Sequence, residues 1–552
     1  MAMLQATALD PRDRRLLSAF ALVGFTILSL GGVFALLMKL VRTPALSVLP
    51  AQTYYQSLTG HGVLMFIFWL GFIQTAFLIV AGTVLVRRPL WSYKMGWAGL
   101  GIMTLAASLA LVAVLRGTSV TYNVPVPLSQ QFQGTSLVLL SYILLAIGMG
   151  VVVVDFILTM LAAVENKRSL NCWAAFFRDL PIATFAAIAG LFIAVPGLLA
   201  ALNTFGGALM WALGNASIDA AAYRTNWHIV FHIYHYIPAL TLVGVAYVLV
   251  EATADAHSIY AKQLAKALFL LYPIFVPPTF IYHLLVDPSL PQYVKTVGTV
   301  LSLLVGVPTL LHTFIILGML ESRMRQAGYG RASWLRHLPW GNPAFSSLTV
   351  GFLTLFLGGT MAYLLLQAPL AAMLHNTFFV PAYIHPIAGG GANIIYMGAI
   401  YLSLPVLLGR RLWGLRLARV QPYLMGLGLT IMALFGAAAG LAGVPRRYAL
   451  IAEDAPERWS TLLNISLGIG ALLAIAAGVL FVLIIVMTAF AGERVTSADD
   501  ALADLAPPLL PRLPGPMPTP IALIPSLAFL VVVVSSTYWA FQHLAGLPLQ
   551  AP

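Results

Sequence analysis

Long apolar stretches alternate with short polar breaks along the whole chain. A membrane-spanning helix needs about 20 apolar residues to cross about 30 Å of hydrocarbon, and stretches of that kind recur thirteen times. They lie near residues 17–40, 61–86, 93–115, 135–162, 181–203, 226–250, 266–286, 294–320, 343–366, 374–408, 419–443, 463–490 and 520–544. The pattern predicts an all-α polytopic membrane bundle of about 13 transmembrane helices.

Composition supports a membrane protein. Charged residues make up 8% of the chain and hydrophobic residues 60%, against about 25% and 45–50% in soluble domains. This excludes a soluble enzyme, a nucleic-acid binder built on basic patches and a disordered scaffold. No separate soluble domain stands out, so residues 1–552 are expected to form one membrane domain, with residues 507–520 as a Pro-rich cytoplasmic linker before the last helix.

The basic residues indicate the orientation of the bundle. With thirteen alternating spans, 21 of the 29 Lys and Arg residues fall in the loops on the side of the N-terminus and eight fall on the other side. Under the positive-inside rule the N-terminus is inside and the C-terminus outside. The expected location is the bacterial cytoplasmic (inner) membrane.

Cysteine usage restricts the redox chemistry. Cys172 is the single cysteine of the sequence, which excludes a disulfide framework, a thiolate zinc site, an iron-sulfur cluster and a CxxCH heme attachment site within this chain. Any redox centre here must be held by histidines.

Several histidines share a depth in the predicted membrane. Intramembrane histidines are costly and are functional candidates by default, although a neutral His bonded to a neighbouring helix is the alternative at each position. Neutral imidazole is a usual ligand of heme iron and copper. The candidates near the outer ends of their spans are His61, His228, His232, His283, His375 and His385.

Two of these sets have a spacing that favours cofactor binding. His61 and His385, on different helices, could clamp a heme on both axial faces, whereas His228 and His232 lie one turn apart on one face. Arg446 and Arg447 lie at the level where heme propionates would emerge; an ordinary juxtamembrane anchor is the alternative.

Several motifs together resemble subunit I of the heme-copper oxygen reductases, and specifically the B-type cytochrome c oxidases. The resemblance covers most of the chain. The predicted topology of thirteen helices, with the N-terminus inside and the C-terminus outside, also matches these oxidases. The motifs are YYQSLTGHGVL at 54–64, LPWGNPAF at 338–345, HNT at 375–377, VP at 380–381 and VPRR at 444–447.

The resemblance implies roles for individual residues. His61 and His385 match the axial ligands of a low-spin heme b, and Arg446 and Arg447 match its propionate-binding arginines. His375 and Asn376 match the segment that touches the propionates of a second heme. For the copper, the matching ligands are His232 and His283, with His228 as a substitute, and Tyr236 matches the tyrosine that is cross-linked to a copper ligand.

Two departures from the family pattern concern the second heme and the copper. Tyr282-His283 stands where the family has two adjacent histidines, and Tyr383-Ile384-His385 stands where it has His-x-His. The proximal ligand of a second heme is therefore expected to be Tyr383. Tyrosinate is an anionic heme ligand that favours ferric iron, which opposes oxygen reduction.

The expected function is that of a terminal respiratory oxidase that passes electrons through heme b to a heme and copper site. The expected partners are a subunit II-type electron-entry subunit and a c-type cytochrome or small copper protein. The chain is also expected to contact membrane lipid and not to bind nucleic acid. Two alternatives stay open. Nitric oxide reductase is disfavoured because no Glu lies near His232, and a catalytically silent heme b electron carrier is favoured by the tyrosine replacements.

Overall fold

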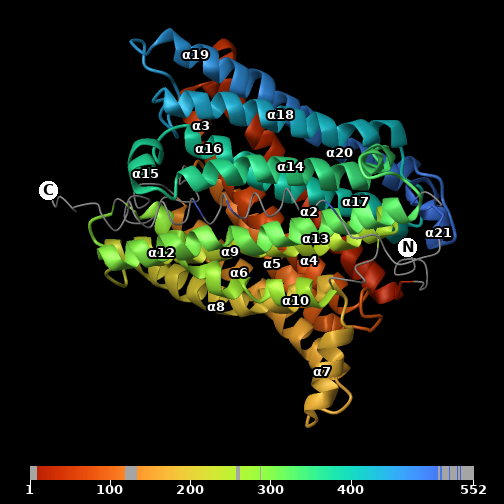
Figure 1. Cartoon of the computed structure of the whole chain (residues 1–552). Helices are drawn as coiled ribbons and strands as arrows, with labels where there is room; N and C mark the ends of the chain where they lie inside the picture. Colours follow the sequence, from red (N-terminus) through yellow and green to blue (C-terminus); the bar gives the residue numbers. More distant parts are fainter. Residues whose placement is uncertain are drawn as a thin grey trace.

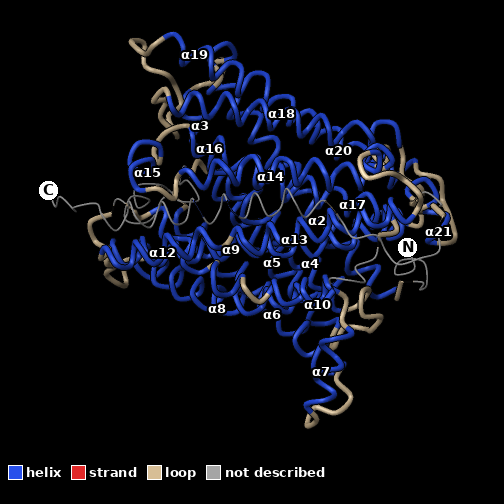
Figure 2. Tube along the Cα trace, in the orientation of Figure 1, coloured by secondary structure: helices blue, strands red, loops and turns tan. Residues whose placement is uncertain are grey.

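Twelve helices long and apolar enough to cross a membrane are found in the part of the chain that this computed structural model describes. That part comprises residues 9–118, 134–256, 262–285 and 287–507, together with 510, 511, 521, 531 and 535. The predicted all-α membrane bundle is thereby confirmed, and Figures 1 and 2 show the helices side by side with loops gathered at their two ends. Most of the thirteenth predicted span, 520–544, lies outside the described residues, as does most of the linker 507–520.

Seven of the spans are single continuous helices. Their ends follow ordinary capping rules: Asp10, Ser92, Asp219 and Asn342 accept backbone N–H groups at the starts of their helices. These helices are α2 (Pro11–Arg42), α5 (Tyr93–Leu115), α6 (Thr135–Ala163), α8 (Ile182–Ala212), α9 (Ala220–Ala254), α14 (Pro343–Leu364) and α18 (Leu415–Leu441).

The other five spans are built from consecutive pieces. They are α3 (Ala51–His61) with η2 (Gly62–Trp69) and α4 (Leu70–Gly82); α10 (Lys262–Phe269) with α11 (Tyr272–Phe275) and η3 (Pro277–His283); α12 (Gln292–Leu304) with α13 (Gly306–Gln326); α16 (Phe379–Ile384) with η5 (His385–Ala392) and α17 (Asn393–Leu408); and α19 (Glu457–Leu463) with η6 (Asn464–Ala471) and α20 (Leu472–Ala491). Shorter elements are η1 (Pro44–Leu46), α7 (Leu170–Asp179), η4 (Ser333–His337), α15 (Ala368–Leu374), α21 (Ala498–Ala501) and η7 (Ala503–Leu505).

Several spans differ from their predicted form. The second was predicted from residue 61 but begins at Ala51, so His61 lies inside the span and not at its end. The seventh is broken because Pro273, Pro277 and Pro278 lack the N–H groups of a continuous helix. The tenth was predicted from residue 374, but the helix begins at Phe379; α15 is a separate short helix, and His375 and Asn376 form the turn between them.

Three segments are π-helical: η2, η5 and η6. Such turns are rare and often occur at functional sites. In this chain η2 begins directly after His61, and η5 begins at His385 itself. Pro386, which lacks an N–H group, lies at the first turn of η5 and is one local reason for the departure from an α-helix.

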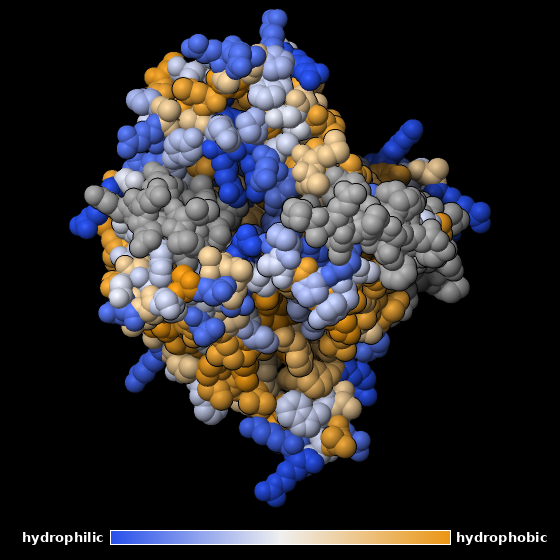
Figure 3. All heavy atoms as spheres, turned by 90° about the vertical axis from the view of Figure 1, so that its left-hand side faces the viewer, coloured by the Kyte–Doolittle hydropathy of each residue, from blue (hydrophilic) through white to orange (hydrophobic). Residues whose placement is uncertain are grey.

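The packing has the character of a membrane bundle. Small residues let helices approach closely: a Cβ on Gly99 of α5 would lie 2.9 Å from the Gly148 carbonyl oxygen of α6. Large apolar side chains on the flanks are exposed, such as Leu22, Phe192 and Leu353, as expected for contact with lipid. At the end of the bundle where α3, α12 and α15 lie, which Figure 3 shows face on, hydrophilic residues gather toward the centre.

Candidate functional site

His61 and His385 lie opposite each other with parallel rings. Their ring centres are 6.2 Å apart and the ring planes differ by 6°. A metal–imidazole nitrogen bond is about 2.1 Å long and the nitrogen lies about 1.2 Å from the ring centre, so two rings on opposite sides of one metal have centres about 6.5 Å apart. The spacing of this histidine pair therefore suits two axial ligands of one iron.

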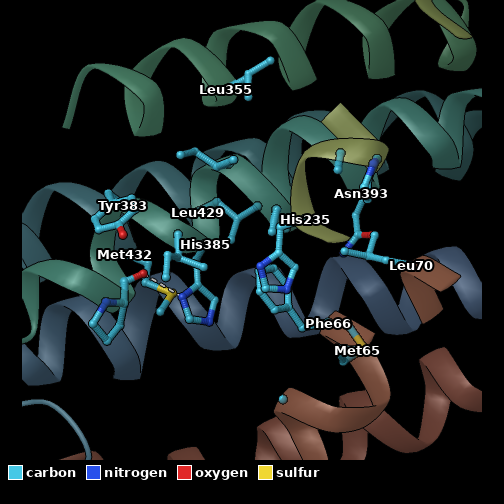
Figure 4. Close-up of a pocket in the computed structure, with 18 of the residues that line it drawn as sticks. Met65, Phe66, Leu70, His235, Leu355, Tyr383, His385, Asn393, Leu429 and Met432 are labelled. Carbon is cyan, nitrogen blue, oxygen red and sulfur yellow. Dashed lines mark hydrogen bonds between the residues drawn. The ribbon is translucent and has the colours of Figure 1, made fainter. Parts of the chain in front are cut away.

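Hydrogen bonds orient both rings of the histidine pair. Nδ1 of His61 lies 3.1 Å from the Gly31 carbonyl oxygen of α2, and Nδ1 of His385 lies 2.7 Å from the Pro381 carbonyl oxygen. A carbonyl can only accept, so each Nδ1 donates, and each Nε2 keeps a lone pair for a metal. Figure 4 shows His385 at the wall of the cavity that the pair shares.

The cavity has a volume of about 980 Å³, at the upper end of the range of about 300–1,000 Å³ for small-molecule sites. Apolar side chains form much of its wall, including Phe66, Leu429 and Met432 in Figure 4. Val33 of α2 and Val479 of α20 also line it, and both are more than half exposed. The cavity thus extends from the histidine pair to the flank of the bundle.

Four further histidines meet in the same cavity or at its rim. The ring of His283 lies 4.6 Å from that of His228, 4.7 Å from that of His232 and 5.2 Å from that of His375, measured between centres. The four come from α9, η3 and the turn after α15. The structure therefore brings together the three histidines that the sequence proposed for the copper, His228, His232 and His283, and places His375, proposed for the second heme, beside them.

These four rings do not yet converge on one point. Within the described residues, no three His, Cys, Asp or Glu side chains are arranged to hold a metal ion. The rings of His228 and His283 stack at 17°, whereas ligands of one metal point their nitrogens at it. The cluster has the composition and proximity of a metal site, and side-chain rotation would be needed to complete it.

Thr279 fixes the orientation of His232. The Thr279 hydroxyl donates to the Val276 carbonyl at 2.6 Å, so its oxygen can only accept from Nδ1 of His232, 3.1 Å away. Nε2 of His232 is then left with its lone pair. The Tyr236 ring lies one turn further along α9, 6.1 Å from the His232 ring.

Tyr383 is buried on α16 and lines the same cavity, packed with Phe379, Val380 and Leu365. It precedes His385 by two residues, a rotation of about 200° on a helix. Figure 4 shows both side chains on this stretch. The side chain of Tyr282, the other tyrosine at a predicted ligand position, lies outside the described residues.

The loop that carries Arg446 and Arg447 is attached to the turn after α15. The Phe378 N–H donates to the Val444 carbonyl at 2.7 Å, and the Arg446 N–H donates to the Asn376 carbonyl at 3.0 Å. Arg446 Nη2 also donates to the Asn376 side-chain oxygen, 3.4 Å away. Both arginines line the cavity, so the predicted propionate-binding residues and the turn with His375 and Asn376 form one rim.

An ion pair between Arg224 and Asp287 lies beside this rim. Burial raises the pKa of Asp287, but hydrogen bonds from the Ser289 hydroxyl and N–H, at 2.7 and 2.9 Å, together with the charge of Arg224, bring the pKa below its usual value. Asp287 is therefore an anion that holds Arg224 near His228. Sequence reasoning did not foresee this pair.

Two basic residues of α2 were missed as site residues. Lys39 and Arg42 were counted with the loops, but both are buried and line the cavity. Arg42 Nη2 donates to the Pro445 carbonyl at 2.7 Å. The signal in the sequence was their spacing of three residues at the end of a span, which places them on one face.

The family model for "Cytochrome C and Quinol oxidase polypeptide I" matches residues 15–473. Cytochrome c oxidase subunit 1 of Thermus thermophilus is 29% identical over 450 residues, covering 78% of this chain and 76% of its own length. The probable cytochrome c oxidase subunit 1-beta of Nocardia farcinica is 26% identical over 509 residues, covering 86% and 78%. A solved heme-copper terminal oxidase dimer has the same fold, with a TM-score of 0.78 at 20% identity over 98% of this chain and 95% of that one.

Proposed function

The chain belongs to the cytochrome c and quinol oxidase polypeptide I family, the catalytic subunits of heme-copper terminal oxidases, and we propose that it is a B-type member that receives electrons at a low-spin heme b. The observation that carries this proposal is the parallel histidine pair. Its spacing of 6.2 Å and the lone pair left on each Nε2 fit two histidines that would bind one heme iron. A bis-histidine heme has no open position, so it transfers electrons and does not bind oxygen.

The residues of the chain have separate tasks in this proposal. His61 and His385 hold the low-spin heme, and the Gly31 and Pro381 carbonyls keep their rings in the ligating tautomer. Arg446 and Arg447 bind its propionates, and the Asn376 contacts keep that loop against the turn after α15. When bound, the heme supplies one-electron redox chemistry between an outer donor and the second site.

The second site is proposed at the four-histidine cluster. His232 and His283, with His228 as the third, would supply imidazoles for a copper, and Tyr383 would supply an oxygen ligand for a second heme, with His375 and Asn376 as candidates to contact its propionates. Thr279 keeps Nε2 of His232 available. Tyr236 is close enough on α9 to share this site, where its hydroxyl is a source of a proton and an electron for oxygen reduction.

Tyr383 favours a second candidate function, that of a heme b electron carrier without reductase activity. An anionic oxygen ligand stabilises ferric iron, whereas oxygen reduction needs ferrous iron. The content of heme and metal separates the candidates. Two hemes and one copper per chain support the oxidase, a non-heme iron in place of copper supports nitric oxide reduction, and one heme without copper supports the carrier.

The test of the low-spin site uses the purified complex. A reduced-minus-oxidised spectrum and the electron paramagnetic resonance of the ferric state should show one bis-histidine heme b per chain. His61→Ala or His385→Ala should abolish that signal, while His337→Ala, an exposed histidine near the far end of the bundle, should leave it unchanged. A wild-type chain without the signal overturns the proposal.

Orientation and partners are part of the proposal. Members of this family normally work in a membrane with subunit II and cytochrome c. The 21-to-8 distribution of basic residues supports an inside N-terminus and an outside C-terminus in a bacterial cytoplasmic membrane. The rim with Arg446 then faces outward, toward a c-type cytochrome or small copper protein docked through subunit II. Protease accessibility of tags at the two ends tests this orientation.

A further inference from the structure

Lys39 and Arg42 are buried cations on the wall of the cavity. Their side chains are 6% and 3% exposed, and they lie three residues apart at the end of α2. The groups that act electrostatically on Arg42 are Tyr54 and Tyr55, and the one that acts on Lys39 is Arg42 itself. Within the described residues, neither cation therefore has a carboxylate partner.

The hydrogen bonds of Arg42 are incomplete. Its Nη2 donates to the Pro445 carbonyl, but Nε and Nη1 are buried and have no hydrogen-bond partner among the described residues. The Tyr54 and Phe378 rings each lie 5.9 Å from the guanidinium carbon, a distance at which cation–π attraction is weak compensation for a buried charge. A buried cation is costly unless it is paired, so this corner of the cavity requires an anion.

The position of the two cations identifies the anion. Both line the same cavity as the histidine pair, and Lys39 lies within electrostatic reach of His61 and of His385. The carbonyl that Arg42 holds belongs to Pro445, directly before Arg446. The two cations thus line the cavity of the histidine pair, and Arg42 contacts the loop that carries the propionate-binding arginines.

We propose that Lys39 and Arg42 form a second anion subsite of the low-spin heme, which binds a carboxylate of the porphyrin from the side of α2. The inference rests on the proposed function, because it assigns a new contact to the cofactor of the histidine pair. It gives the heme cationic partners on two sides, α2 and the loop after α18. Arg42 also links these sides, since one guanidinium contacts the loop and faces the cavity.

The positive charges have an expected effect on the heme itself. A cation beside the iron favours the reduced state, which carries one positive charge less. Removing Lys39 or Arg42 should therefore lower the midpoint potential of the low-spin heme as well as weaken its binding.

The experiment compares Lys39→Met, Arg42→Met and the charge-conserving Lys39→Arg and Arg42→Lys in the complete purified complex. Heme loss is followed with apomyoglobin as a scavenger. Loss of a charge-assisted hydrogen bond should accelerate it about tenfold or more. The charge-conserving variants should stay near wild type, and Arg458→Met, at an exposed arginine in the first turn of α19, is the matched control.

A second readout identifies the anion. With heme labelled with ¹³C at the propionate carboxyls, redox-induced infrared bands of these groups should shift in both methionine variants. Unchanged heme loss, potential and carboxyl bands overturn the proposal. The proposal is also overturned if the methionine variants lose a tightly bound anionic lipid while the carboxyl bands stay unchanged. The cavity reaches the lipid-facing flank, so the anion would then be a lipid phosphate. These outcomes can be interpreted only if the wild-type complex shows the low-spin heme signal. If that signal is absent, the proposed function fails and not this further proposal alone.

Discussion

The contact between α16 and α18 at Gly440 sets the position of His385, and its perturbation can be worked out from the structure. A Cβ on Gly440 would lie 2.2 Å from the Phe379 backbone nitrogen and 2.6 Å from the Phe379 Cβ. Ordinary van der Waals contact begins at 3.4 Å, so Gly440→Ala must separate the two atoms by at least 1.2 Å, the difference between 3.4 and 2.2 Å. Because the obstacle is backbone, no rotamer change relieves it.

The separation should reach the heme ligand. Phe379 begins the six-residue helix that ends just before His385, so a rigid displacement of α16 moves that imidazole by a similar amount. Metal sites tolerate deviations of about 0.2 Å in ligand distance. Overpacking of this kind costs about 1–3 kcal/mol. We expect Gly440→Ala to lower the low-spin heme content several-fold and to reduce the thermal stability of the complex.

The assay is heme b per chain from the pyridine hemochrome spectrum, together with the temperature of half-inactivation. A graded series gives the comparison. Gly436→Ala would place a Cβ 3.1 Å from the Ala382 Cβ and should have a smaller effect, and Gly207→Ala, with no atom within 4 Å, should have none. Equal heme content in all three variants would refute the argument that the α16–α18 contact positions the ligand.

Three further predictions concern the second site and its rim. Tyr383→His should raise the midpoint potential of the second heme and shift its absorption bands, since a neutral ligand replaces an anionic one; an unchanged spectrum would remove Tyr383 as a ligand. Thr279→Val removes the acceptor that orients His232 and should weaken metal binding about 10- to 100-fold by metal analysis after dialysis, whereas Thr279→Ser should retain it; equal loss in both variants would contradict that role. The lowered pKa of Asp287 means that its pair with Arg224 stabilises the protein fully above the unfolded-state pKa of about 3.9, and that this stabilisation is lost as pH falls through the folded-state value. Asp287→Asn should therefore flatten the dependence of the unfolding temperature on pH below about pH 5, and an unaltered profile would show that the pair does not contribute.

Hydropathy predicted the twelve spans that the structure contains. The prediction succeeds because whether an apolar stretch spans the membrane is determined locally, by the cost of exposing its backbone and side chains. The same rule is insensitive to breaks inside a span. The prolines from Pro273 to Pro278 divide the seventh, and the turn at His375 shortens the tenth, without lowering the apolar content that the rule measures. The single membrane domain over residues 1–552 and the thirteenth helix stay predictions.

The candidate site was predictable where a residue type has an intrinsic cost in a membrane. Intramembrane histidines are rare enough to be noticed, and the structure brings His61 to His385 and His283 to His228. Lys39 was not noticed, since a lysine at the end of a span usually reaches water. Its burial depends on how α2 packs in the folded bundle, which no local pattern contains.

The two π-helical segments beside the histidine pair have equal length, and a second contact closes them at the other end. Both η2 and η5 span eight residues. Trp69, the last residue of η2, donates a buried hydrogen bond of 2.7 Å to Asn393, the residue directly after η5. This bond joins the two helices at the end away from the histidine pair, and neither can slide or rotate against the other there without breaking it. The polypeptide therefore sets the width of the gap between the rings when it folds, so the gap has the width that a flat cofactor needs before the cofactor binds.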